Sequence, residues 1–361
     1  MAHDAVRQCA VDGAAADMAA QSLEERGFAS LAVATSTAST AAHAFAIARS
    51  ALDVLEDGPP PLGPHTTDTA NASGSHRAGA LSSYNACREG FVFSNGASFS
   101  VHGVDGFEAA MSAFFNVAME AAHAVLAAIE RRLQLPLHWF ETALGPLSEH
   151  AQWHMKRYVP ESAPRHAVTT DGKLVLLAVH SDPSLISLVF HDAPGRQPGA
   201  MGLECQVTKD GQSTWEPVSS HGHEVVTVLC GSIMEKLTGR VLGAVRHRVA
   251  MPSEAALETQ SGRRVAATFF FRPAPSAFLQ PPPSPLLPRA RGPPIQYSAW
   301  LRKVASRYER HAPPAVFAKA APSPVANGSQ GEGPPAAITF SVRVTEGDDG
   351  RAALDARIRP L

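Results

Sequence analysis

The feature of the sequence that most limits the possible folds is a series of short apolar or alternating runs in the middle of the chain. Five such runs follow one another, and clusters of Gly, Pro, Asp and Ser separate them. They cover residues 174–179, 184–190, 224–229, 244–249 and 265–271. Because short strands must share a core, these runs predict a mainly β domain, either a barrel or a sandwich.

Helical periodicity dominates the region before these strands. Residues 28–33 form a short apolar run that predicts a strand, and residues 37–55 then predict a helix. Residues 105–133 place Phe, Met, Ala and Ile at steps of three and four, which predicts one long, largely buried helix. Residues 57–79 contain almost no large apolar side chains, so we expect a loop or a disordered insertion there.

The last part of the chain differs in composition. Fifteen of the 29 prolines lie between residues 273 and 335, and proline-rich segments favour extended, solvated backbone. Residues 297–308 interrupt this pattern with apolar side chains at helical spacing, which predicts a helix with one face on the core. Residues 338–344 alternate like a strand, for which the sequence identifies no partner.

These patterns divide the 361 residues into three parts. Residues 1–150, with the insertion at 57–79, form an N-terminal helical and mixed region that packs on the core. Residues 151–275 form the β core, and residues 276–361 form a loose proline-rich tail with one helix near 297–310. The hydrophobic fraction of 45% is sufficient for one sizeable core.

Charge and cysteine usage argue against several classes of protein. Thirty-one basic residues against 33 acidic ones give a net charge of −2, which provides no general attraction to nucleic acid. The four cysteines show no C-x-x-C spacing, and the N terminus shows no secretory pattern. Residues 29–52 are alanine-rich but carry many Ser and Thr together with His43 and Arg49, so we expect no membrane span. A cytoplasmic protein fits these observations best.

A candidate metal site follows the first strand-like run. His180 and Asp182 are two residues apart, and side chains with this spacing on a strand point to the same side. With one distant histidine they would form the two-histidine, one-carboxylate set that binds non-haem Fe(II) and leaves coordination positions open. We select His247, which lies in the strand-like run 245–249. The alternatives are a surface pair in a turn and a core histidine held by a hydrogen bond.

Arg264 could hold the far end of a ligand that binds the metal at its open coordination positions. If the metal binds one end of a dicarboxylate, the other carboxylate needs a fixed cation, and a guanidinium is a bidentate and permanently charged one. Arg263 keeps open a register shifted by one residue, because strand alternation puts the two side chains on opposite faces. A solvated arginine at a strand edge is the remaining alternative.

Taken in order, these residues resemble the isopenicillin N synthase-like family of iron- and 2-oxoglutarate-dependent dioxygenases. The likeness extends over roughly residues 25–310. It implies a double-stranded β-helix, or jelly-roll, core with flanking helices. The matching segments are residues 179–192 for the family's His-Thr-Asp block, Trp215-Glu-Pro-Val218 for its Trp-x-x-Val motif, residues 225–240 for its strand and Gly-Asp turn, His247-Arg-Val249, and residues 264–273.

The resemblance also implies an activity. His180, Asp182 and His247 would hold Fe(II), and 2-oxoglutarate would chelate the iron while Arg264 and Tyr158 bind the co-substrate. With O2 in the remaining position, the chain would be an oxidoreductase that hydroxylates or desaturates a small organic substrate. No catalytic residue beyond the metal ligands is implied.

Three departures from the family pattern concern the co-substrate pocket and the turn near the metal. The family's Arg-x-Ser pair is Arg264-Val-Ala266 here, its Asn-Tyr-Tyr-Pro is Arg157-Tyr158-Val159-Pro160, and its Gly-Asp is Gly231-Ser232. These changes keep open a second hypothesis, in which the chain is a catalytically inactive family member. It would then act as a binding or scaffold protein through its core and its proline-rich tail.

Two further histidine-containing groups and one proline-rich segment have simpler interpretations. His221, His223 and Glu224 form a rival metal cluster by residue type, but they lie in a predicted loop without a distant partner. His191 and Asp192 are typical of a strand-end pair. Pro285-Leu-Leu-Pro288 fits a polyproline ligand for an SH3-type partner, although most such segments are spacers.

Overall fold

A computed structural model describes most of the chain. The described residues are 10–57, 73–78, 87–94, 99–163, 168–169, 172–192, 202–218, 222–252, 264–289, 292–311, 338–346 and 352–360. They fall into two compact units, Met1–Arg307 and Tyr308–Leu361. The first unit contains every residue that the sequence singles out as chemically active.

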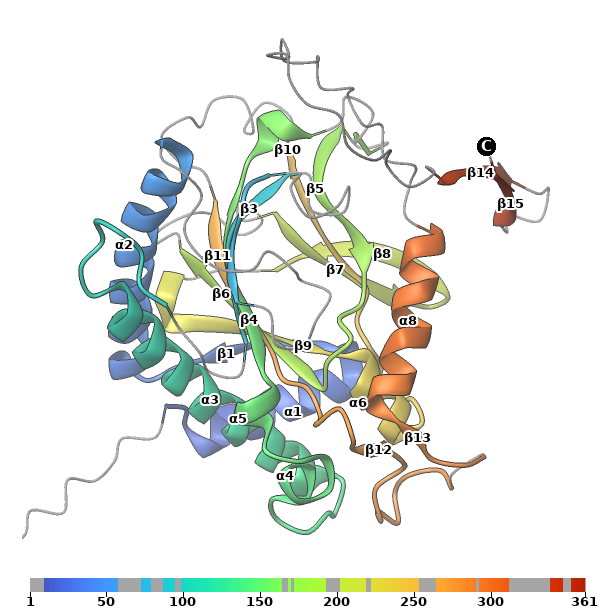
Figure 1. The fold of residues 1–361 in the computed structure, drawn as a ribbon. Helices are drawn as coiled ribbons and strands as arrows, with labels where there is room; N and C mark the ends of the chain where they lie inside the picture. Colours follow the sequence, from blue (N-terminus) through green and yellow to red (C-terminus); the bar gives the residue numbers. More distant parts are fainter. Residues whose placement is uncertain are drawn as a thin grey trace, which may run out of the picture. The chain divides into compact units, whose positions relative to one another are not determined.

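Two antiparallel sheets form the core of the first unit (Figure 1). The larger sheet has the order β1-β9-β6-β11-β4-β3-β2, with β1 Phe28–Ala32, β2 Gly74–His76, β3 Arg88–Ser94, β4 Gln152–Tyr158, β6 Ile186–Asp192, β9 Val225–Cys230 and β11 Val265–Phe270. The smaller sheet has the order β5-β10-β7-β8, with β5 Lys173–His180, β7 Leu203–Lys209, β8 Gln212–Pro217 and β10 His247–Pro252.

The inner faces of the two sheets pack against each other. One buried cluster contains Leu177, Leu203 and Val249 from the smaller sheet together with Val189 and Ala266 from the larger one. Strand alternation turns every second side chain of these strands toward the shared interior. This arrangement confirms the predicted mainly β core with flanking helices, and it is the jelly-roll architecture that the sequence resemblance implied.

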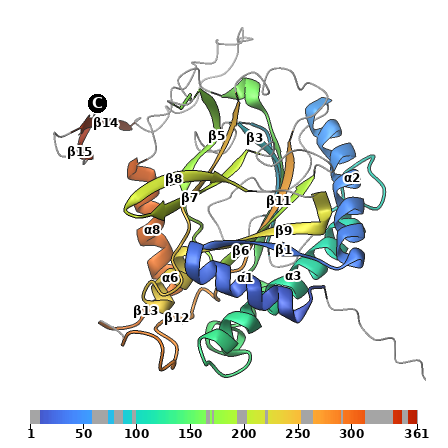
Figure 2. The same cartoon turned by 180° about the vertical axis from the view of Figure 1, so that it is seen from behind.

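Helices cover the outer face of the larger sheet. Figure 2 shows α1 along β1 and β9 and α2 at the side of the sheet, and α3 packs against both of these helices. Their alanine, leucine and phenylalanine side chains pack into the main hydrophobic core with the outward residues of β4 and β11. The helices are α1 Gly13–Arg26, α2 Thr35–Asp57, α3 Phe107–Arg132, α4 Trp139–Leu144, α5 Leu147–His150 and α6 Ser232–Thr238.

Aromatic packing fixes α3 on the sheet. Trp153 of β4 and Phe269 of β11 are cross-strand neighbours, and their rings stack with centroids 4.8 Å apart. Phe114 of α3 meets the Phe269 ring edge-on at 5.1 Å. Among the described helices, α3 is the one whose length and hydropathy would suffice to cross a membrane, and its apolar face is instead buried in this core.

The strands and helices predicted from periodicity occur at β1, α2, α3, β5, β6, β9, β10 and β11. The sequence analysis did not predict α1 or the strands β2, β3, β4, β7 and β8. Alanine gives α1 a weak apolar stripe, although Asp12 caps its first turn and Gly27 ends it in the left-handed conformation. The strand β2 lies within the segment 57–79, of which residues 58–72 lie outside the described part.

The compact unit continues beyond the predicted end of the core at residue 275. The short strands β12 Phe278–Leu279 and β13 Ile295–Gln296 pair, and the Leu279 side chain is buried. Helix α8, Tyr297–His311, begins with a buried tyrosine whose neighbours Trp300 and Leu301 pack against the main core. In the second unit β14 Ile338–Glu346 pairs with β15 Ala352–Pro360, which supplies the strand partner that the sequence did not identify.

Candidate metal and co-substrate site

The smaller sheet brings the two candidate histidines together. His180 is the last residue of β5, His247 is the first residue of β10, and the two are register partners in the antiparallel pair. Asp182 follows two residues after β5, on the connection to β6. Residues 67 positions apart along the chain therefore become neighbours, since antiparallel pairing joins the end of one strand to the start of the other.

A backbone clamp holds the loop that carries Asp182. The Ser232 amide and hydroxyl donate to the Asp182 carbonyl oxygen at 2.8 and 3.0 Å. The preceding Gly231 donates its N–H to the Leu185 carbonyl oxygen at 2.9 Å. A Cβ at Gly231 would lie 2.0 Å from the Ser184 carbonyl oxygen, so this close approach requires glycine. Gly231 and Ser232, which stand where the family has Gly-Asp, therefore hold the loop that carries Asp182.

Three potential ligand atoms converge at this point. Each residue offers one atom, and the atoms of His180, Asp182 and His247 all lie within 4.8 Å of one another. Asp182 Oδ1 is 3.4 Å from His180 Nε2 and 3.7 Å from His247 Nε2. The two imidazole rings are tilted by 54°, with centroids 4.1 Å apart. One cation can contact all three side chains from a single position.

The outer nitrogens of both imidazoles face backbone carbonyls. His180 Nδ1 is 2.8 Å from the Ala178 oxygen, and His247 Nδ1 is 3.4 Å from the Val245 oxygen. A carbonyl accepts only, so these contacts favour the tautomer with a proton on Nδ1. The lone pair of each Nε2 then points toward the carboxylate, as metal-binding histidines require.

The protonation states also suit a divalent cation. Burial, together with the neighbouring His180, lowers the pKa of His247 to about 4, so this imidazole is neutral at pH 7. Burial alone would raise the pKa of Asp182, but the adjacent imidazoles hold it well below its usual range, so the side chain is ionised. Ligands must reach a metal in these deprotonated forms.

Iron fits this donor set. Asp182 Oδ2 is buried and has no hydrogen-bond partner among the described residues. A buried carboxylate oxygen without a partner is costly unless a cation occupies the site. Two imidazole nitrogens and one carboxylate on one side of a cation leave further positions open, which is the arrangement of non-haem Fe(II) oxygenases.

Arg264 lies on the inner face of the larger sheet, next to the start of β11. Its side chain is buried, at 4% exposure, and its guanidinium lies over the Tyr158 ring at 4.4 Å. Nη2 approaches His191 Nδ1 at 3.5 Å, whereas Nε and Nη1 have no hydrogen-bond partner in the described part of the chain. A buried cation with two unused donors fits the far carboxylate of 2-oxoglutarate.

Strand alternation corrects one expectation about this pocket. Arg157 was expected at the asparagine position of the family's pocket, but its side chain points to the outer face. There it bonds Glu89 at 2.9 Å and Asp53 at 2.8 Å. The inner face of β4 instead carries Lys156 and Tyr158, which the sequence analysis had not considered together. Their i, i+2 spacing is the signal that would have identified Lys156.

The rival metal clusters do not assemble among the described residues. His223 Nε2 lies 3.6 Å from Asp192 Oδ1, and the His223 ring stacks on Phe45 at 5.2 Å. Arg49 also forms an ion pair with Asp192. His221 lies outside the described residues, as does Arg263. The Asp192 carboxylate is therefore part of a charged contact with α2.

Comparison with known proteins agrees with this geometry. Residues 154–273 match the family model described as the 2OG-Fe(II) oxygenase superfamily. That segment begins on β4 and ends just after β11, so it contains all three residues of the triad together with Arg264 and Tyr158. No curated protein matches the chain at a significant level.

Solved structures share the fold at low sequence identity. A full-length Neurospora crassa protein crystallised with alpha-ketoglutarate and thymine has a TM-score of 0.61 and 15% identity, over 82% of this chain and 92% of its own. A putative 2OG-Fe(II) oxygenase family protein from Caulobacter crescentus has a TM-score of 0.59 and 18% identity, over 82% and 94%. A dioxygenase for auxin oxidation in rice has a TM-score of 0.53 and 17% identity, over 83% and 93%.

Proposed function

We propose that this chain, a member of the 2OG-Fe(II) oxygenase superfamily, holds Fe(II) with His180, Asp182 and His247 and binds 2-oxoglutarate with Arg264 and Tyr158. The observation that carries the assignment is the convergence of two imidazoles and one carboxylate within 4.8 Å, on the same interior as a buried guanidinium with unused donors. The triad is complete in the described chain, so nothing there favours an inactive scaffold.

Each protein group has a defined task in this reaction. The Ala178 and Val245 carbonyls orient the two imidazoles, and Ser232 holds the backbone of Asp182. The Tyr158 ring positions Arg264, which fixes the far end of the co-substrate so that its keto acid end faces the triad. The apolar inner cluster around Leu177 and Val249 keeps bulk water from the reacting groups.

When bound, Fe(II) with 2-oxoglutarate would supply the O2-activating redox chemistry that hydroxylates a C–H bond or desaturates a C–C bond of the substrate. We propose a small organic molecule as this substrate. The thymine crystallised with the Neurospora crassa protein supports that size class. The isopenicillin N synthase-like group remains our proposal for the subfamily, on the motifs that the sequence analysis identified.

An anaerobic titration tests the assignment. Adding Fe(II) and 2-oxoglutarate to the purified protein should produce the weak visible charge-transfer band of an iron–keto acid chelate. His180→Ala should abolish the band, whereas His102→Ala, which changes an exposed turn, should leave it intact. If His180→Ala retained the band and co-substrate turnover, the metal assignment would be wrong.

We also propose a cytoplasmic location. The buried Cys205 and Cys230 are free thiols, which fits a reducing compartment. Microscopy of a fluorescent fusion in the source cells would test this, and a signal confined to a secretory compartment would contradict it.

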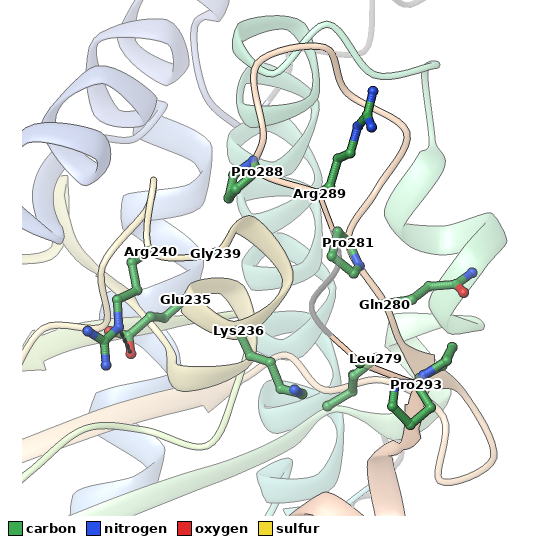
Figure 3. A pocket seen from close by; sticks show the side chains of 12 residues that line it. Glu235, Lys236, Gly239, Arg240, Leu279, Gln280, Pro281, Pro288, Arg289 and Pro293 are labelled. Atoms are coloured by element: carbon green, nitrogen blue, oxygen red, sulfur yellow. Dashed lines mark ion pairs between the residues drawn. The ribbon is translucent and has the colours of Figure 1, made fainter.

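An SH3-type partner of the proline-rich segment is a second candidate role. Pro288 packs at Gly239 in a hollow between α6 and residues 279–289 and 292–294, which Figure 3 shows with Glu235 and Arg240 beside it. Leu286, within the same motif, is 51% exposed. A panel of SH3 domains should bind the chain and lose binding with Leu286→Asp. If the unaltered chain and Leu286→Asp bound the SH3 domains equally well, the role of this segment as an SH3 ligand would be contradicted.

A further inference from the structure

Lys156 occupies a distinctive position on the inner face of β4. Its side chain is 5% exposed, and it is the cross-strand partner of Ala266 on β11. Ala266 is the position where the family's Arg-x-Ser pair would carry a hydroxyl. Directly opposed residues of an antiparallel pair have Cβ atoms about 5 Å apart and share one face. The side chain of Lys156 therefore leaves the backbone next to the position where the family has the missing hydroxyl.

Within the described ranges Lys156 forms no ion pair at contact distance, although the charge of Asp182 acts on it. Its Nζ lies 5.8 Å from the centroid of the Phe270 ring. Burial, with a further contribution from Arg88, lowers the pKa of Lys156 well below its ordinary value. An unpaired buried ammonium is costly, so Lys156 favours its neutral form when the site is empty and holds its proton when an anion lies beside it.

The position of Lys156 on β4 indicates where that anion would lie. It is two residues from Tyr158, whose ring lies under Arg264, on the same face of the strand, and the charges of Asp182 and Arg264 both affect its pKa. It thus lies where it can act on both ends of the candidate site. A dicarboxylate that reaches from the triad to Arg264 runs along the same inner face of β4 and β11.

We infer that Lys156 is a second cation for 2-oxoglutarate and replaces the hydroxyl that Ala266 lacks. The inference rests on the proposed function and assigns a residue to its co-substrate. With the keto acid end on the iron, Arg264 and the Lys156 ammonium are the two cationic groups beside the rest of 2-oxoglutarate. The neutral imidazole of His191, whose pKa burial and then Arg264 hold well below its ordinary value, adds no competing charge.

The test is the affinity of the iron-loaded, oxygen-free full chain for 2-oxoglutarate, measured by calorimetry. Lys156→Met keeps the length of the side chain and removes its charge, and the dissociation constant should rise about 10- to 100-fold, as expected for a lost charged hydrogen bond. Lys156→Arg should stay within a few-fold of the original chain. Lys236→Met, which removes a lysine from α6, is the matched control and should change nothing.

A rescue separates a binding role from a structural one. Adding Ala266→Ser to Lys156→Met restores the family's hydroxyl at the opposing position and should recover part of the lost affinity. The affinity for Fe(II) without 2-oxoglutarate should not fall in any of these variants, because none of them removes a metal ligand and loss of the Lys156 charge can only favour a bound cation. If Lys156→Met does not fold, Lys156→Gln serves with the same expectation.

The outcomes distinguish a failure of the proposed function from a failure of the role of Lys156. If the unaltered chain binds iron but no 2-oxoglutarate, the proposed function fails. If the unaltered chain binds 2-oxoglutarate and Lys156→Met binds it equally well, the role of Lys156 is overturned while the proposed function stands. A loss in Lys156→Met that Ala266→Ser partly restores supports both.

Discussion

Two buried arginines on neighbouring strands of the larger sheet have opposite surroundings. Arg157, on the outer face of β4, donates to Glu89, Asp53 and the Leu52 carbonyl oxygen. Arg264, on the inner face beside β11, has two donor nitrogens without partners among the described residues. Both side chains are about equally buried, at 5% and 4% exposure.

The difference separates structural charges from functional ones. A buried charge that exists for stability is satisfied by the chain itself, since an unpaired one destabilises the fold. A buried charge that the chain leaves unsatisfied is available for a ligand. By this criterion the charges on the outer face of the larger sheet hold α2, and the unsatisfied charge on the inner face supports the proposed site for an anion beside a metal.

The largest effect is expected at the triad. Asp182→Ala should lower Fe(II) affinity by more than about 100-fold, because loss of an outer-shell partner alone costs up to that much and this residue is a ligand. Metal content after dialysis against Fe(II) measures it, with Asp210→Ala, in a surface turn, as the control. Retention of one iron per chain in Asp182→Ala would contradict the ligand role.

The paired arginine should matter for stability. Arg157→Met leaves the buried Glu89 without its partner and should lower the free energy of unfolding by about 3 kcal/mol. Denaturation in urea gives the value, and Arg26→Met, which breaks an exposed ion pair with Glu216, should cost under about 1 kcal/mol. Equal losses in the two variants would remove the contrast between buried and exposed pairs.

The unpaired arginine should matter for binding instead. Arg264→Met should weaken 2-oxoglutarate binding about 30-fold or more, from the loss of a charge-assisted contact. Its free energy of unfolding should stay the same or rise, because the variant removes an unpaired buried charge. A large loss of stability without a loss of affinity would reverse the distinction between the two arginines.

A smaller effect is expected from the aromatic support of Arg264. Tyr158→Leu removes the ring under the guanidinium and should weaken 2-oxoglutarate binding about 3- to 30-fold, in line with a buried cation–π contact. The affinity for Fe(II) alone should be unaffected. Should Tyr158→Leu bind 2-oxoglutarate as well as the original chain, the ring has no part in positioning Arg264.

The smallest effect concerns the loop clamp. Ser232→Ala removes one hydrogen bond to the Asp182 carbonyl oxygen but keeps the backbone N–H contact, so the free energy of unfolding should fall by about 1 kcal/mol. Urea denaturation of the metal-free protein measures this. A loss comparable to that of Arg157→Met would show that the hydroxyl has a larger structural role.

Much of the fold was predictable because its signals are local. Apolar periodicity placed most strands of the core and the long helix α3, and the order of motifs indicated which strands carry His180, Asp182 and His247. The strand β3 escaped prediction because Arg88 and Glu89 at its start are charged and yet buried. Only contacts with distant elements explain such burial.

The sequence by itself determined which residue types are available for the site and the order in which the strands carry them. Only the tertiary structure decided which face of β4 is functional, and it assigned Lys156 rather than Arg157 to the interior. The reason is that helices cover one face of β4 and the second sheet covers the other. Along β4 the polar Gln152, His154 and Lys156 alternate with the apolar Trp153 and Met155, but neither set faces solvent. The alternation therefore does not show which face lines the site.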